Sequence, residues 1–359
     1  YNRRPWVHAF GTMLPPQKDY GTTTKPVVGL KTGHGLGLVP KVGIARYNYG
    51  FRTVPYSSMV QADIAMSTAT RGIKATAQYD KRFESSDIHV PLLAQVSQLE
   101  VTQFNGFGNR VEESSDKFFE VKQTQWQLNP AIGFSFAPES DITLGPVVRY
   151  TKTDSAETFL TDLHPYGFRT YAQAGMRAAL HFDSKPVSND SMKPRVLLDF
   201  AGSAYPGGTL DVATAYESLE GSAVSFMTIG LPNRPVLALR AGGKKLFGNF
   251  PYFDAAFLGG GSSFRVDHRQ RYAGDESVYG SSELRVPVAK FPLVLPLDVG
   301  VLGFADVGRV YVDGDSPGGW HNAEGGGFWV GLVNPGLNLN VLFTNRSDKR
   351  VIVNLGFTY

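Results

Sequence analysis

The chain has 359 residues and a net charge of +3, with 40 glycines, 12% aromatic and 19% charged residues, and no cysteine. The missing cysteine excludes disulfides and thiolate metal sites. The scattered, nearly balanced charges argue against nucleic acid as a partner. No apolar run approaches the roughly eighteen residues of a membrane-spanning helix. The first residue is Tyr1 rather than Met, so we expect a mature or trimmed chain whose upstream domain is missing.

Taken in chain order, residues 1–24 are expected to be a lead-in segment and residues 25–359 a single domain of β-strands. The prediction depends on apolar and polar residues that alternate with period two from near residue 40 to the end. About sixteen strands are expected, and 25–33 is a further candidate. The expected strands are 41–50, 57–68, 72–80, 88–103, 117–136, 142–153, 171–182, 194–204, 221–230, 234–244, 252–260, 276–288, 297–312, 324–333, 335–345 and 351–359.

The two faces of these strands differ in a way that favours a membrane barrel over a soluble sandwich. In 72–80 and 171–182, one face is apolar and the other mixes small residues with isolated charges. A Lys or Arg on the lipid side at mid-bilayer would cost about 2–4 kcal/mol, so the charged face must point inward. Aromatic residues near strand ends, Tyr311, Trp329 and Tyr359, are predicted to lie in interfacial belts. The fold class is therefore all-β, a single closed antiparallel transmembrane β-barrel with a long loop folded into the lumen.

The stretch LGGGSSFRVDHRQRYAGD (258–275) carries Arg265, Asp267, His268, Arg269, Arg271 and Asp275. Alternation places Glu283 and Asp306 in the lumen, on strands that follow each other in sequence. Two inward carboxylates need a cation, and a guanidinium can bind carboxylates through paired hydrogen bonds. We expect a latch in which Arg265 and Arg271 hold Glu283 and Asp306. A catalytic acid–base set is the less favoured interpretation. The sequence predicts no catalytic residues, no metal site and no cofactor, so an enzyme is not expected.

The segments LGGGSSFRVDHRQRYAGD, YGSSELRVP and GFADVG together resemble the outer-membrane assembly factor superfamily of BamA/TamA-like and bacterial surface antigen barrels. The resemblance implies a sixteen-stranded barrel of the bacterial outer membrane in which the loop arginine binds acidic residues of the two following strands. The positions that match the family motifs are Gly259, Gly260, Arg265, Arg271, Gly274, Asp275, Glu283, Phe304, Asp306 and Gly308.

The loop departs from the family pattern at Val266 and Asp267, where the family has glycine and an aromatic residue. FNGFGNRVEE (104–113) is similar to a segment of surface antigen barrels that carry soluble passenger domains. The resemblance implies insertion, translocation or secretion of proteins, with a client or passenger polypeptide and outer-membrane lipid or lipopolysaccharide as partners. Two alternatives stay open, namely a barrel that anchors an N-terminal passenger enzyme domain and a plain solute pore. The departure at the loop tip favours the passenger alternative.

Overall fold

The computed structural model describes residues 18–33, 35–111, 117–154, 158–184, 194–260, 263–265, 267, 269–292, 297–332, 337–344 and 352–355. Most of these residues belong to antiparallel strands. Three short helical segments occur among them, α1 (Phe159–Leu163), η1 (Lys117–Phe119) and η2 (Tyr252–Asp254). None of the helices in the described ranges has the length and apolarity needed to cross a membrane.

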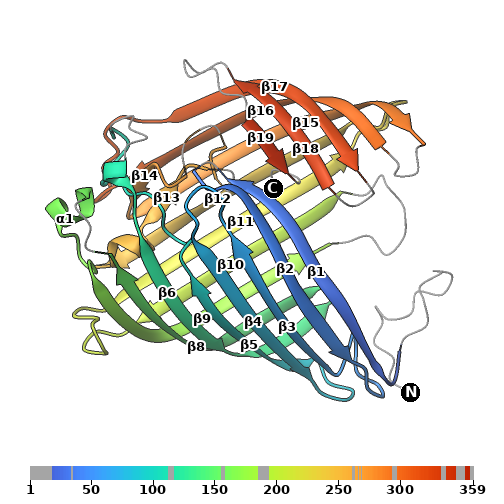
Figure 1. Cartoon of the computed structure of the whole chain (residues 1–359), viewed down its shortest axis with the longest axis horizontal. Coiled ribbons are helices and arrows are strands. Elements are labelled where there is room, and N and C mark those ends of the chain that lie inside the picture. The colour runs from blue at the N-terminus through green and yellow to red at the C-terminus, as the bar shows by residue number, and fades with distance from the viewer. Residues whose placement is uncertain are drawn as a thin grey trace.

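Seventeen strands form one large sheet in which neighbours in sequence are neighbours in space. The sheet curves round so that the Cα atoms of β19 come within 8 Å of those of β1, and Figure 1 shows the resulting barrel. The strands are β1 (Thr22–Gly33), β2 (Gly37–Asn48), β3 (Ser58–Met66), β4 (Ile73–Arg82), β5 (Ile88–Ser97), β6 (Gln123–Pro130), β7 (Ile132–Ala137), β8 (Ser140–Thr153), β9 (Thr170–Asp183), β10 (Arg195–Tyr205), β11 (Tyr216–Thr228), β12 (Val236–Gly248), β15 (Glu276–Phe291), β16 (Leu297–Tyr311), β17 (His321–Leu332), β18 (Leu337–Thr344) and β19 (Ile352–Leu355).

β6 and β7 are two halves of one interrupted strand, because both pair with β5 on one side and with β8 on the other. The seventeen described strands of the sheet therefore occupy sixteen positions. The predicted barrel of about sixteen strands is confirmed, but one member of the expected set is wrong. Residues 252–260 form no wall strand, since they contain η2 and the short β13 (Ala256–Leu258), which pairs with β14 (Tyr272–Gly274) apart from the wall. The place in the wall is filled by β1, which covers the further candidate 25–33.

The outer face of the wall carries a continuous band of apolar side chains. Strand alternation turns these residues away from the lumen, and their exposed fractions lie between 46% and 57% for Ile44, Ile64, Leu128, Leu144, Phe200 and Leu219. Such a band is costly in water and is stabilised in hydrocarbon, which is what a transmembrane barrel requires. The inward-facing charges predicted from alternation are confirmed on β16, where Asp306 is 3% exposed while its outward neighbour Val307 is 40% exposed.

One predicted belt residue points the other way. Trp329 lies opposite Gly300 and packs against the lumenal cluster that contains Leu302, so it faces inward. Its indole occupies the space over Gly300, where an added Cβ would come within 2.6 Å of the ring. Tyr359 lies outside the described residues.

The two ends of the barrel differ in their connections. Antiparallel order brings the longer connections 98–122, 154–169, 206–215, 249–275 and 312–320 to one end, called here the long-loop end. Most connections at the other end are shorter, such as 138–139 and 229–235, although the connection 184–194 is longer than 206–215. The two longest connections, 98–122 and 249–275, thus lie at the same rim, in partial agreement with the expected pattern of tight turns at one rim and larger loops at the other. In Figure 1 the long-loop end lies on the left, beside α1.

Two of the long connections fold into the lumen and pack on each other. Phe104 from connection 98–122 and Tyr252 from η2 have ring centroids 5.4 Å apart, and their exposed fractions are 0% and 1%. Backbone N–H of Gly108 donates to the carbonyl of Ala273 at 2.8 Å, which joins the first connection to β14. The expected long loop inside the lumen is therefore confirmed, and it has a second segment beside it.

Candidate functional site

The centre of the site is Arg265, which lies in the lumenal loop between β13 and β14. Its Nη1 donates to Glu283 Oε2, its Nε donates to Asp306 Oδ2 at 2.7 Å, and its backbone N–H reaches the same Oδ2 at 3.3 Å. The exposed fractions are 6% for Arg265, 0% for Glu283 and 3% for Asp306. The three side chains are therefore desolvated together, and each charge depends on the others for compensation. We call this group the Arg265 latch.

The wall strands place the two carboxylates through their register. Glu283 is opposite Phe304 in the β15–β16 ladder and Ser281 is opposite Asp306, so the carboxylates occupy adjacent inward rows of neighbouring strands. Phe304 is the inward neighbour of both, opposite Glu283 and two residues before Asp306. The guanidinium carbon of Arg265 is 4.7 Å from the ring centroid of Phe304. A cation over an aromatic face gains further attraction in a desolvated site. One guanidinium can thus bind both carboxylates and also contact the ring of Phe304.

A second arginine reaches the same carboxylate and was not among the predicted site residues. Arg285 Nε donates to Glu283 Oε1 at 2.5 Å, and Arg285 is 5% exposed. The signal was present in the sequence, since Arg285 is two residues after Glu283 on the same inward face. Glu283 therefore has one cation from the loop and one from its own strand.

Arg271 has a different place from the one predicted. It donates from Nη1 to Asp267 Oδ1 at 2.8 Å, within the loop itself, and its guanidinium carbon lies 5.3 Å from the ring centroid of Tyr272. Asp267 is one of the two positions where the loop departs from the family pattern, and it is only 3% exposed. The departure thus has a structural counterpart, because the carboxylate of Asp267 compensates a buried arginine of the same loop. Val266 lies outside the described residues.

The motif glycines surround the latch where backbones approach closely. Gly259 and Gly260 have φ values of 122° and 86°, a region that side chains disfavour. At Gly274 an added Cβ would lie 2.1 Å from the carbonyl oxygen of Tyr311, and at Gly308 it would lie 2.8 Å from Leu258 Cδ1. These glycines therefore allow β13 and β14 to lie directly against the inner wall. Asp275, the last motif position of the loop, accepts a hydrogen bond from Lys245 Nζ at 2.6 Å.

Side-chain amides hold the connection 98–122 in the lumen. One amide comes from the loop between β13 and β14, called here the latch loop, and another binds the wall strand β16. Gln270 Nε2 donates to the carbonyl of Glu100 at 2.5 Å, and its Oε1 accepts from the backbone N–H of Thr102 at 2.9 Å. Asn109, from the FNGFGNRVEE segment, donates to the Val310 carbonyl at 2.8 Å and accepts from the Val310 N–H at 3.0 Å. The segment FNGFGNRVEE therefore belongs to the site as well. The sequence analysis singled it out only for its similarity to surface antigen barrels.

η2 adds a second buried charge cluster, which no motif or alternation in the sequence predicts. Asp254 accepts hydrogen bonds from Arg149, from Tyr216 Oη at 2.7 Å and from Gln173 Nε2 at 3.1 Å. Burial alone would raise the pKa of the Asp254 carboxyl, but the charge of Arg149 together with these hydrogen bonds outweighs burial and holds the pKa below its ordinary value. Asp254 is thus an ionised anchor between the lumenal segment and the wall strands β8, β9 and β11.

The described contacts of the site are hydrogen bonds and ion pairs that hold segments of the chain in place. Glu283, Asp306 and Asp254 all receive charge-assisted hydrogen bonds from arginines, and such bonds are about twice as strong as neutral ones. Within the described ranges, no group of three or more His, Asp or Glu side chains is placed to hold a metal ion. The arrangement holds two lumenal segments against the barrel wall.

No protein-family model matches the sequence, and no curated protein matches it. Solved structures do match. A crystal structure of BamA from Haemophilus ducreyi lacking POTRA domains 1–3 superposes with a TM-score of 0.66 at 13% identity, over 93% of this chain and 69% of that one.

Two structures of CdiB also match. CdiB from Escherichia coli gives a TM-score of 0.58 at 11% identity, over 95% of this chain and 63% of that one. CdiB from Acinetobacter baumannii gives 0.55 at 12% identity, over 93% and 58%. The chain spans less than two thirds of both CdiB chains. The resemblance predicted from the loop and strand motifs is confirmed at the level of the fold, which is the β-barrel fold of BamA and CdiB.

Proposed function

We propose that this chain is a bacterial outer-membrane barrel that inserts, translocates or secretes client polypeptides. The fold shared with BamA and CdiB supports this class of function. The observation that carries the proposal is the junction between the first and last strands, called here the seam. The client or passenger polypeptide and the lipid of the outer membrane are the proposed partners.

Within the described residues, the seam differs from the other strand junctions of the wall. β1 pairs with β2 over its full twelve residues, from Thr22 opposite Asn48 to Gly33 opposite Gly37. On its other side the described residues of β1 and β19 approach within 8 Å without a registered ladder. β1 also contains Pro26, and proline is confined to edge strands or bulges because it cannot donate to a ladder. Such an edge can accept a client strand by β-augmentation.

The Arg265 latch has a complementary role in this proposal. It fixes the loop to β15 and β16, which are separated from β19 by two further strands. A fixed lumenal core keeps this part of the wall rigid while the seam opens. No catalytic step is proposed, because the buried carboxylates are held by arginines.

The two alternatives receive less support. A plain solute pore has no need of two lumenal segments joined to the wall by buried ion pairs. A passenger anchor would use the same barrel, and the loop departure that favoured it now has a local explanation in the Asp267–Arg271 pair. Insertion or secretion is therefore the function that we propose.

A cysteine crosslink across the seam tests the proposal. The chain contains no cysteine, so one pair can be introduced into β1 and β19 without background. Closing the seam is expected to abolish client insertion or secretion and reduction is expected to restore it, because the client strand needs the free edge.

The matched control is a cysteine pair at Val28 and Val42, which face each other in the β1–β2 ladder. This pair crosslinks two strands that stay together and is expected to leave activity unchanged. Undiminished insertion and secretion with a fully crosslinked seam would contradict the proposal.

A further inference from the structure

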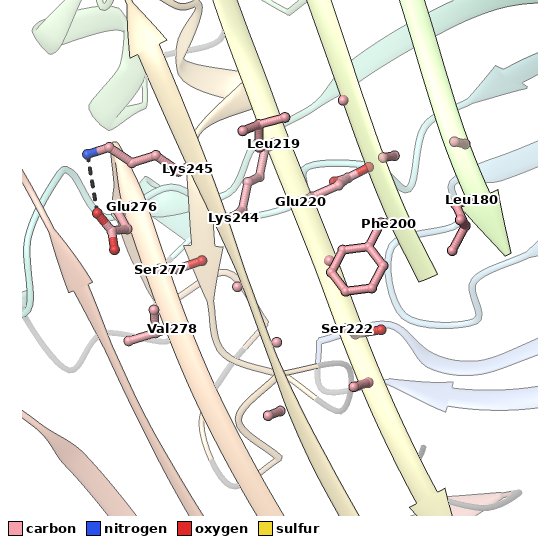
Figure 2. Close-up of a pocket in the computed structure, with 18 of the residues that line it drawn as sticks. Leu180, Phe200, Leu219, Glu220, Ser222, Lys244, Lys245, Glu276, Ser277 and Val278 are labelled. Carbon is pink, nitrogen blue, oxygen red and sulfur yellow. Dashed lines mark ion pairs between the residues drawn. The ribbon is translucent and has the colours of Figure 1, made fainter. Parts of the chain in front are cut away.

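The outer wall has two hollows that reach the long-loop end, and their charges differ. The first has a volume of about 680 Å³ and lies over glycine and alanine positions of β9 to β12 and β15, bordered by Phe200, Leu219 and Val278 (Figure 2). Its outward cation is Lys245, which is held by Asp275 at 2.6 Å and by Glu276 at 3.3 Å. This cation is therefore already compensated within the protein.

The second hollow, called here the rim groove, has a volume of about 550 Å³. It lies between the β3–β4 turn, the residues that lead into β6 and the end of β8. Three cations line it, Arg71, Lys122 and Lys152, and all three are exposed. None of them forms an ion pair with another described residue, in contrast to Lys245.

An aromatic pair lies next to these cations on the same outer face. Trp126 and Tyr150 are opposite each other in the β6–β8 ladder with ring centroids 5.3 Å apart, and they are 38% and 40% exposed. Lys152 follows Tyr150 by two residues, so it lies about 7 Å closer to the rim at the usual strand rise. Indole and phenol rings favour the boundary between hydrocarbon and headgroups, and the cations therefore lie at headgroup level.

We propose that the rim groove binds the phosphate of a membrane lipid headgroup. Guanidinium and ammonium groups complement the phosphate, while Trp126 packs against the start of the acyl chains. Two carboxylates, Glu120 and Asp154, also line the groove, which leaves one net positive charge and makes affinity sensitive to either acid. A soluble phosphate would gain nothing from the aromatic pair, so the lipid is the ligand that fits both parts of the groove. The inference rests on the proposed placement of the barrel in a membrane.

Lipid retention in native mass spectrometry tests the proposal. The whole chain is released from nanodiscs of phosphatidylcholine doped with phosphatidylglycerol, and bound lipids are counted. The triple variant Arg71→Gln, Lys122→Gln, Lys152→Gln is expected to lose phosphatidylglycerol binding by about fivefold per cation removed, on the order of a hundredfold together. Asp154→Asn is expected to increase retention, which gives a reading even if the triple variant does not fold.

Lys245→Gln is the matched control, because it removes an outward cation of the long-loop end that already has carboxylate partners. It is expected to leave phosphatidylglycerol retention unchanged. Equal retention by the wild-type chain and a folded triple variant would overturn the proposal, as would displacement of the lipid by inorganic phosphate at matched concentration. Heat-modifiable mobility and client insertion are measured on the same variants. Loss of lipid binding with both preserved identifies the groove, and a wild-type chain that retains lipid but inserts no client counts against the proposed function alone.

Discussion

At the scale of the residue, Arg265 resolves a conflict that strand alternation creates. The period of two that turns apolar residues toward lipid also turns Glu283 and Asp306 inward, where burial penalises their charge. Two such carboxylates on neighbouring strands require a cation, so this part of the site follows from sequence. The sequence did not show which arginine of the loop binds these carboxylates, because the pairing depends on the path of the loop. Arg271 instead forms an ion pair with Asp267.

Removal of the latch cation is expected to be strongly destabilising. Arg265→Met keeps the bulk of the side chain but leaves two buried carboxylates without their loop partner, a change that costs about 3–5 kcal/mol in buried pairs. Urea unfolding of the detergent-solubilised barrel measures the free energy. Adding Asp306→Asn to the variant is expected to restore part of the loss, because it removes one uncompensated charge.

Lys290→Met provides the comparison for this variant. Lys290 forms an ion pair with Asp298 at 3.8 Å, and its side chain is 76% exposed. Exposed pairs contribute about 0–1 kcal/mol, so this substitution is expected to be nearly silent. Equal unfolding free energies for the Arg265 and Lys290 variants would show that the latch has no energetic role.

At the scale of the element, period two predicted almost every wall strand and also produced the one wrong assignment. Residues 252–260 have the apolar content of a wall strand, yet they lie inside the barrel, where an enclosed segment has the same composition as a lipid-facing one. β1 was a weaker candidate because Pro26 and the two lysines of TTTKPVVGLKTG reduce its strand signal. Local pattern therefore finds strands but cannot tell whether an apolar segment faces lipid or a lumenal core.

The contribution of Asp254 to the stability of the folded chain is expected to depend on pH. The pKa of Asp254 is lower in the folded chain than the unfolded value near 4. Ionised Asp254 therefore contributes its full stabilisation above about pH 4, and this contribution is lost as pH falls through the depressed folded value. Stability of the wild-type chain and of Asp254→Asn, measured from neutral pH to about pH 2, is expected to converge at the acid end. Parallel curves over the whole range would exclude this role for Asp254.

At the scale of the whole molecule, the number of strands and the closure of the barrel were predictable, but the strand that closes it was not. Each strand pairs with its sequence neighbour, so alternation and turns were enough to count them. The contact of β1 with β19 joins the two ends of the chain, and no local pattern reports on it. The packing of connection 98–122 on the latch loop is equally distant in sequence. It depends on Gln270, whose amide gives no signal in sequence that it bonds near Thr102.

The packed lumen is expected to limit ion flow. In planar bilayers, the wild-type barrel is expected to conduct weakly because two connections occupy its long-loop end. Arg265→Glu places three carboxylates together and is expected to expel the loop and raise conductance several-fold. Arg234→Glu, at an exposed position of a short connection, serves as the control with the same change of charge. Identical conductance in all three proteins would contradict a role of the latch in closing the lumen.

The bonds between Gln270 and the first lumenal connection also restrict the order in which the protein can fold. Gln270 and Thr102 are 168 residues apart in sequence, and contacts of such separation form slowly because loop closure is costly in entropy. The contact also needs distant parts of the wall, because Thr102 follows β5 and Gln270 precedes β15. We therefore expect the contacts between the two lumenal connections to form late in folding, after the strands that carry the connections have paired.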